Sequence, residues 1–322
     1  MNILLINNFD PCGMSIKLKN AINNLTEHNC RSITVSAVKW SWEKDIFIDD
    51  ILNFEEIYDL INKSNVLQFN IWHWDDIFPF GTIKWEEFIW NKKVTVMISA
   101  DYFVFHPKRY LNKLKSLGIK PLFLTSYMAE FFGTDEFIPF FYDIPPIDPV
   151  IEEKKKNSKY IKIGHSHSSA TFGKGTPLFL DIMDKVSKKF DNIIIQDITN
   201  KPHDEYIKLL QSCDIVLSTI SWDGLWGFVT MESMGLGIPT LTFSTDDILE
   251  KYKKVLGFSE IPMIYGNPDE IYNKLVELIN DREKRQVIGN KSKEWVKKYW
   301  SREKIVPMFI DFYEKLPILK RI

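Results

Sequence analysis

The stretch from Gly224 to Thr240, GLWGFVTMESMGLGIPT, combines turn-forming glycines with an expected helix that starts at about Phe228. The first N–H groups of a helix lack internal partners and the helix dipole favours an anion beside them, so Phe228 and Val229 predict a phosphate site. Gly227 lets a ligand approach the backbone closely. Glu232, one turn into the helix, is placed to accept hydrogen bonds from sugar or ribose hydroxyls. The alternative is an exposed helix residue bordered by ordinary turn glycines.

The elements that must position these residues follow an alternating pattern. Short apolar runs alternate with amphipathic stretches of helix length, which indicates an α/β protein with two doubly wound, Rossmann-like parallel sheets facing a cleft. The expected strands are Asn2–Asn7, Ser32–Val38, Val66–Ile71, Val94–Ile98, Pro121–Leu124, Glu136–Pro139, Tyr160–Gly164, Asn192–Ile198, Asp214–Ser218 and Pro239–Phe243. From Pro268 the chain is expected to be helical almost to its end, with breaks near Asp281 and Tyr299.

A change of composition marks the expected domain boundary. The segment Asp143–Lys159 joins several prolines to a run of charges, which is typical of a linker. We therefore expect a Rossmann-like domain over residues 1–145, a linker over 146–159, a second domain over 160–300 and a final helix over 301–322.

Composition and motifs exclude several classes of protein. With 41 Lys and Arg against 43 Asp and Glu, the net charge of −2 argues against a protein dedicated to wrapping DNA. Cys12, Cys30 and Cys213 are scattered, which fits reduced thiols in a cytoplasmic protein. No targeting signal or membrane-length apolar run occurs, so a soluble protein is expected. No GxGxxG follows either first strand, and no P-loop, HExxH or GxSxG occurs, which disfavours oxidoreductases, nucleotide triphosphatases and common hydrolases.

The stretch from Gly224 resembles the signature of the retaining, group-one glycosyltransferases, which have the two-domain GT-B fold. The residues in register with that signature are Gly227, Glu232, Met234, Gly237 and Pro239. The first acidic residue of the family pattern would fall on Gly224, and Asp223 stands one position earlier.

A second resemblance to this family lies at the expected first strand of the second domain. Lys174, followed by Gly175, matches the lysine that neutralises the donor diphosphate. His165 stands where the family often has an arginine, and Ser166 is placed to donate to phosphate oxygens. The alternatives are a solvated lysine and polar loop residues.

In the first domain the resemblance is looser. Gly13 follows the first strand, where the family has a glycine loop beside its ligands. Asp101 matches the second member of the family's histidine–aspartate pair, whereas Ala100 replaces the histidine that touches the transferred sugar. His73, between two tryptophans, is the first candidate to replace it and His106 is another, although a packing role for His73 is equally expected.

The resemblance implies an enzyme that transfers a hexose or related sugar from a nucleoside-diphosphate donor with retention of configuration. Lys174, Asp101 and His73 are the expected catalytic residues, and no metal or other cofactor is expected. The second domain would bind the donor, the first would bind the acceptor, and the final helix would cross back to the first. The acceptor remains open among saccharides, lipids, small molecules and modified nucleic-acid bases, so DNA is not excluded. A nucleotide-sugar epimerase of the same fold and a non-catalytic nucleotide-sugar-binding protein are the alternatives.

Overall fold

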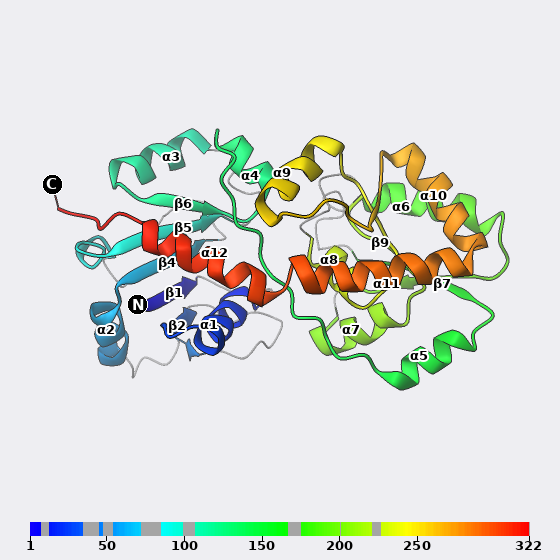
Figure 1. The fold of residues 1–322 in the computed structure, drawn as a ribbon, viewed down its shortest axis with the longest axis horizontal. Coiled ribbons are helices and arrows are strands. Elements are labelled where there is room, and N and C mark those ends of the chain that lie inside the picture. The colour runs from blue at the N-terminus through cyan, green and yellow to red at the C-terminus, as the bar shows by residue number, and fades with distance from the viewer. Residues whose placement is uncertain are drawn as a thin grey trace. The chain divides into compact units, whose positions relative to one another are not determined.

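The computed structural model describes residues 1–7, 13–34, 45–47, 54–71, 85–98, 107–166, 175–199, 201–220 and 227–321. The chain forms two compact units (Figure 1). The first contains Met1–Pro139 and Arg302–Ile322, and the second contains Phe140–Ser301. Each unit is a parallel sheet flanked by its own helices.

The strands of the first unit lie in the order β3-β2-β1-β4-β5-β6, and every pair of neighbours is parallel. Its strands are β1 (Asn2–Asn7), β2 (Asn29–Thr34), β3 (Ile46–Phe47), β4 (Val66–Ile71), β5 (Lys93–Ile98) and β6 (Lys120–Phe123). Its helices are α1 (Met14–Leu25), α2 (Phe54–Lys63), the 3₁₀ turn η1 (Trp85–Glu87), α3 (Pro107–Ser116), α4 (Ser126–Phe131) and α12 (Arg302–Lys315). This is the Rossmann strand order, which reverses between β1 and β4.

The strands of the second unit lie in the order β11-β10-β9-β7-β8 and are also parallel. Its strands are β7 (Ile161–His165), β8 (Ile193–Asp197), β9 (Ile215–Leu217), β10 (Thr240–Thr242) and β11 (Ile264–Tyr265). Its helices are α5 (Pro149–Lys156), α6 (Thr176–Ser187), α7 (His203–Gln211), α8 (Phe228–Gly235), α9 (Asp246–Leu256), α10 (Pro268–Asn280) and α11 (Arg282–Tyr299). This is the other common doubly wound order, and it reverses between β7 and β9.

The predicted fold class, two Rossmann-like parallel-sheet domains, is confirmed. Within the described ranges, no helix is both long and apolar enough to cross a membrane.

The expected strand Glu136–Pro139 is wrong, because this segment has no strand structure. Its backbone joins β6 through a hydrogen bond from the Ile138 N–H to the Phe123 carbonyl, 2.9 Å long. Proline has no N–H to donate, so Pro139 cannot continue a ladder. The buried side chains of Phe137 and Ile138 explain why the segment had the apolar character of a strand.

The segment 146–159, expected to be a linker, contains helix α5. The Asp148 carboxylate accepts a hydrogen bond from the Val150 N–H at 2.9 Å, and Pro149 occupies the first turn. An aspartate cap followed by proline is a helix-start pattern, and lysines suit the last turn of a helix. Reciprocal hydrogen bonds between the Asp148 backbone and the Gln211 side chain, 3.0 and 3.1 Å long, tie this start to α7.

Candidate functional site

The candidate site lies at the carboxyl ends of β7 and β9, where the strand order of the second sheet reverses. Connections from two such strands leave in opposite directions, and doubly wound proteins bind ligands at this point. The chain after β7 leads to α6, and the chain after β9 leads to α8. Two helix starts therefore follow this edge of the sheet.

His165, the last residue of β7, is buried with 3% of its surface exposed. Its Nδ1 lies 2.9 Å from the Leu217 carbonyl oxygen at the end of β9. Since a carbonyl only accepts, Nδ1 carries a proton, and in the neutral ring Nε2 then accepts from the Thr176 hydroxyl, 3.2 Å away. The ring also stacks on Phe179, with centroids 4.3 Å apart. His165 thus joins the two strand ends to the first turn of α6.

Gly175 caps the start of α6 in the left-handed backbone region, with φ of 75°. This conformation favours glycine over residues that carry a Cβ atom. Ser166 lies directly after β7 and is partly exposed.

Gly227 caps the start of α8, and Phe228 and Val229 form its first turn. The hydroxyl oxygens of Ser218, directly after β9, and Thr230 lie 2.7 Å apart and are buried. This contact holds the first turn of α8 against the end of β9. The backbone N–H groups predicted to bind phosphate therefore belong to a helix whose first turn is held against the sheet.

Glu232 is buried, with 6% of its surface exposed, and both of its carboxylate oxygens have partners on α7. The Tyr206 hydroxyl donates to Oε2 at 2.7 Å, and the His203 Nε2 lies 3.4 Å from Oε1. A carboxylate offers about four acceptor positions, so these contacts leave room for further donors. The alternative interpretation, that Glu232 is an exposed helix residue, is wrong because its carboxylate is buried and held by two side chains.

Other residues of the family-like stretch serve the fold. Gly237 has φ of 77° just beyond the end of α8, where the Gly237 and Ile238 N–H groups donate to the Met234 and Ser233 carbonyls. This is the Schellman arrangement that closes a helix. A Cβ atom on Gly289 of α11 would lie 2.0 Å from the Gly237 carbonyl oxygen. The turn that ends α8 and helix α11 therefore pack closely through these two glycines.

The first unit has a buried polar network at its own point of strand reversal. The Asn7 carboxamide oxygen, at the end of β1, accepts from Asn70 Nδ2 at 2.6 Å and from the Ser15 hydroxyl. The Gln68 amide donates to Asn70 Oδ1 at 2.9 Å and accepts from the Tyr313 hydroxyl of α12 at 2.7 Å. Burial raises the pKa of Tyr313, which keeps this donor protonated. The network thus links α1 and α12 to the strand ends.

The remaining predicted site residues divide into two groups. Gly13 caps the start of α1 with φ of 64°, beside the network in sequence. Lys174, Asp101, His73, His106 and Asp223 lie outside the described residues. Sequence reasoning missed Tyr206 and His203, although their spacing of three residues on one helix is the signal that places both on one face.

Comparison with known proteins finds glycosyltransferases. No protein-family model matches the chain. An uncharacterized glycosyltransferase of Methanocaldococcus jannaschii is 27% identical over 139 residues, which is 41% of this chain and 38% of that protein. The matched region thus spans less than half the length of this relative.

Solved structures match nearly the whole chain. Sucrose-phosphate synthase from Thermosynechococcus elongatus matches with a TM-score of 0.64, at 12% identity over 98% of this chain and 99% of that one. HepE from Anabaena, in complex with UDP, matches with a TM-score of 0.65, at 12% identity over 98% and 100%. A Listeria monocytogenes protein named for UDP-N-acetylglucosamine 2-epimerase matches with a TM-score of 0.54, at 12% identity over 100% and 99%. The chain is therefore glycosyltransferase-like in fold throughout and in sequence over part of its length.

Proposed function

We propose that this protein transfers a sugar from a nucleoside-diphosphate donor to an acceptor hydroxyl or amine, with the donor held by the second unit. The observation that carries the proposal is the edge of the second sheet at β7 and β9. There His165 ties both strand ends to the start of α6, and the buried Glu232 lies one turn into α8. The fold likeness to HepE in complex with UDP supports the same reading.

The proposed donor site divides its tasks among neighbouring groups. The starts of α6 and α8 supply backbone N–H groups and helix dipoles for the diphosphate. Lys174, one residue before the α6 cap, adds a positive charge, and Glu232 accepts hydrogen bonds from the ribose hydroxyls. Charge compensation by these groups requires no metal ion.

The proposed reaction breaks the bond between the anomeric carbon and the diphosphate oxygen, whose electron pair leaves with the nucleoside diphosphate. A bond forms between the anomeric carbon and the acceptor, which loses one proton. We propose that His73 of the first unit meets the sugar and accepts that proton, that Asp101 assists it, and that configuration is retained. Lys174 and the helix starts meet the charge that develops on the leaving diphosphate.

Calorimetry with UDP, GDP and ADP on the full chain tests the donor site. We expect one of the three to bind, and Glu232→Gln to weaken that binding. Absence of binding by all three would contradict the proposal.

Turnover of the matching nucleotide sugars, with and without cell extract as a source of acceptors, then separates the three functions. A transferase releases nucleoside diphosphate and labels an acceptor. An epimerase changes the sugar without net release of diphosphate, and a binding protein does neither.

A further inference from the structure

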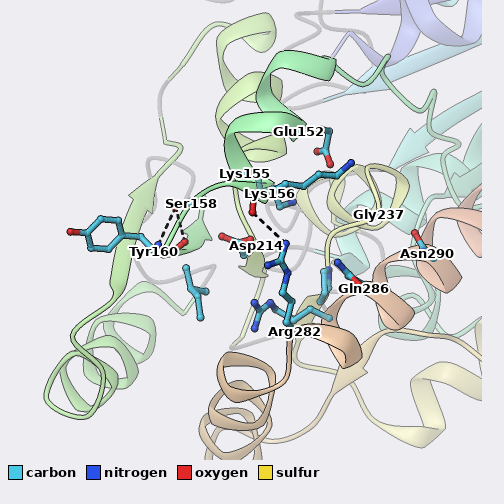
Figure 2. Close-up of a pocket in the computed structure, with 13 residues that line it drawn as sticks. Glu152, Lys155, Lys156, Ser158, Tyr160, Asp214, Gly237, Arg282, Gln286 and Asn290 are labelled. Carbon is cyan, nitrogen blue, oxygen red and sulfur yellow. Dashed lines mark hydrogen bonds between the residues drawn. The ribbon is translucent and has the colours of Figure 1, made fainter.

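A pocket of about 320 Å³ opens at the opposite edge of the second sheet, where the strands begin. Its wall includes Ile161 at the start of β7, Asp214 just before β9 and Pro239 just before β10. The proposed donor site lies at the carboxyl ends of the same strands. The pocket, whose lining Figure 2 shows, is therefore separate from the proposed donor site on the same unit.

The pocket gathers positive charge from two helix ends. Lys155 and Lys156 come from the last turn of α5, and Arg282 and Arg285 come from the first turn of α11. Two carboxylates, from Glu152 and Asp214, also line it. Four cations thus face two anions.

These four cations have no carboxylate partner within 4.0 Å among the residues that the structure describes. Lysines elsewhere on the same unit do have such partners, as in the pairs Lys185–Asp181 and Lys188–Asp184, at 2.7 and 2.6 Å. Asp214 is engaged by the Lys162 N–H at 2.9 Å. The described lining of the pocket, with four cations and two carboxylates, therefore keeps a net positive charge.

The arginines are oriented by backbone carbonyls. Nη1 of Arg285 donates to the Leu278 and Ile279 carbonyls at 2.6 and 3.0 Å, at the end of α10. Nη2 of Arg282 lies 3.4 Å from the Lys156 carbonyl and links α11 to α5 (Figure 2). Burial lowers the pKa of Arg285, and the nearby positive charge of Arg282 lowers it further, whereas the carboxylates of Asp214 and Asp281 raise it. A bound anion would stabilise the charged form of Arg285.

One face of α11 contributes an arginine and two neutral carboxamides to the pocket wall. Arg282, Gln286 and Asn290 are spaced by four residues, so they follow one another along the helix, and all three line the pocket (Figure 2). Guanidinium groups match the geometry and charge of phosphate, and carboxamides suit hydroxyl groups. The pocket volume falls in the range of small-molecule sites, about 300–1,000 Å³.

We propose that this pocket binds a phosphate monoester of a small polyol or sugar. The phosphate dianion contacts the cations of α5 and α11, and the hydroxyl groups contact Gln286 and Asn290. Because the ligand also touches Gly237 and Pro239, it lies against the end of α8 and the start of β10. The proposal does not depend on the function proposed for the opposite edge.

Calorimetry on the full chain tests this proposal with glucose 6-phosphate, ribose 5-phosphate and inorganic phosphate. We expect one ester to bind more tightly than inorganic phosphate, whether or not the donor site is saturated with its nucleoside diphosphate. Arg282→Gln should weaken that binding at least about tenfold, since a hydrogen bond to a charged group is lost. Lys284→Gln is the matched control on the same helix turn, because Lys284 pairs with Glu277 and does not line the pocket.

Three results would overturn the proposal. If none of the three probes binds at concentrations up to roughly 10 mM, the pocket is not a binding site for phosphate or its esters. Equal affinity for inorganic phosphate and both esters would remove the ester assignment. An unchanged affinity in Arg282→Gln, with a circular dichroism spectrum like that of the unaltered chain, would place any binding elsewhere.

Discussion

The contact between Tyr206 and Glu232 predicts a specific local stability of helix α8. In Tyr206→Phe the carboxylate keeps its burial but loses the hydroxyl that donates to Oε2 at 2.7 Å. A hydrogen bond to a charged group contributes about 1.5–3 kcal/mol, and a buried acceptor left without a donor adds a penalty in the same direction. The longer contact of 3.4 Å to His203, on a partly exposed side chain, cannot fully replace it.

Hydrogen exchange read out by mass spectrometry measures this effect on peptides that cover α8. A loss of 1.5–3 kcal/mol corresponds to roughly 10- to 150-fold faster exchange where local opening is limiting. Tyr272→Phe on α10 is the matched control, since no hydrogen bond of its hydroxyl occurs in the described part of the chain. Peptides from β1 should be unaffected in both variants. Unchanged exchange of α8 in Tyr206→Phe would refute the view that α7 holds Glu232 in place.

Three further predictions concern catalysis, packing and thiol chemistry. Steady-state kinetics should show that Lys174→Ala lowers turnover by about 10²–10³-fold, whereas Glu232→Gln mainly raises the donor KM, because a ribose contact is made in both ground and transition states. Gly289→Ala should destabilise the second unit by about 1–3 kcal/mol or more in thermal unfolding, since the new Cβ would meet the Gly237 carbonyl oxygen; an unchanged Tm would contradict this packing. Burial raises the pKa of Cys213 to about 12 and also raises that of Cys30, so both stay protonated at pH 8. Peptide mapping after iodoacetamide treatment should find both unmodified in the native chain and modified in guanidinium chloride.

The main strands were predictable because they carry their signal locally. The apolar runs Asn2–Asn7 and Val66–Ile71 agree with β1 and β4, and the expected helix breaks near Asp281 and Tyr299 agree with the ends of α10 and α11. Strands β3 and β11 have two residues each, which is too short for a hydrophobic pattern. Strand β2 begins at Asn29, before the expected start at Ser32. The polar residues Asn29 and Arg31 are not fully buried, so the apolar pattern did not include them.

The site was predictable only where its residues are neighbours in the chain. The starts of α6 and α8 follow from turn glycines and helix patterns, and the structure has helices at both places. The partners of these residues come from distant segments, as with His165 and the Leu217 carbonyl, which are 52 residues apart. Asn7 and Asn70 are 63 residues apart. A single sequence carries no local signal for such pairs, because tertiary packing alone brings them together.

The family-like stretch therefore combines two kinds of residue that a sequence pattern cannot separate. Gly237 is required by its positive φ and by its close approach to Gly289, whereas Glu232 is a buried carboxylate that the fold supports with two donors. Burying a carboxylate is unfavourable unless it is well hydrogen-bonded, and a packing helix gains nothing from the charge itself. A chain that only needed this helix as a scaffold would be better served by an apolar residue at position 232. The acid at this position, with acceptor positions to spare, supports the proposal that Glu232 accepts hydrogen bonds from the donor.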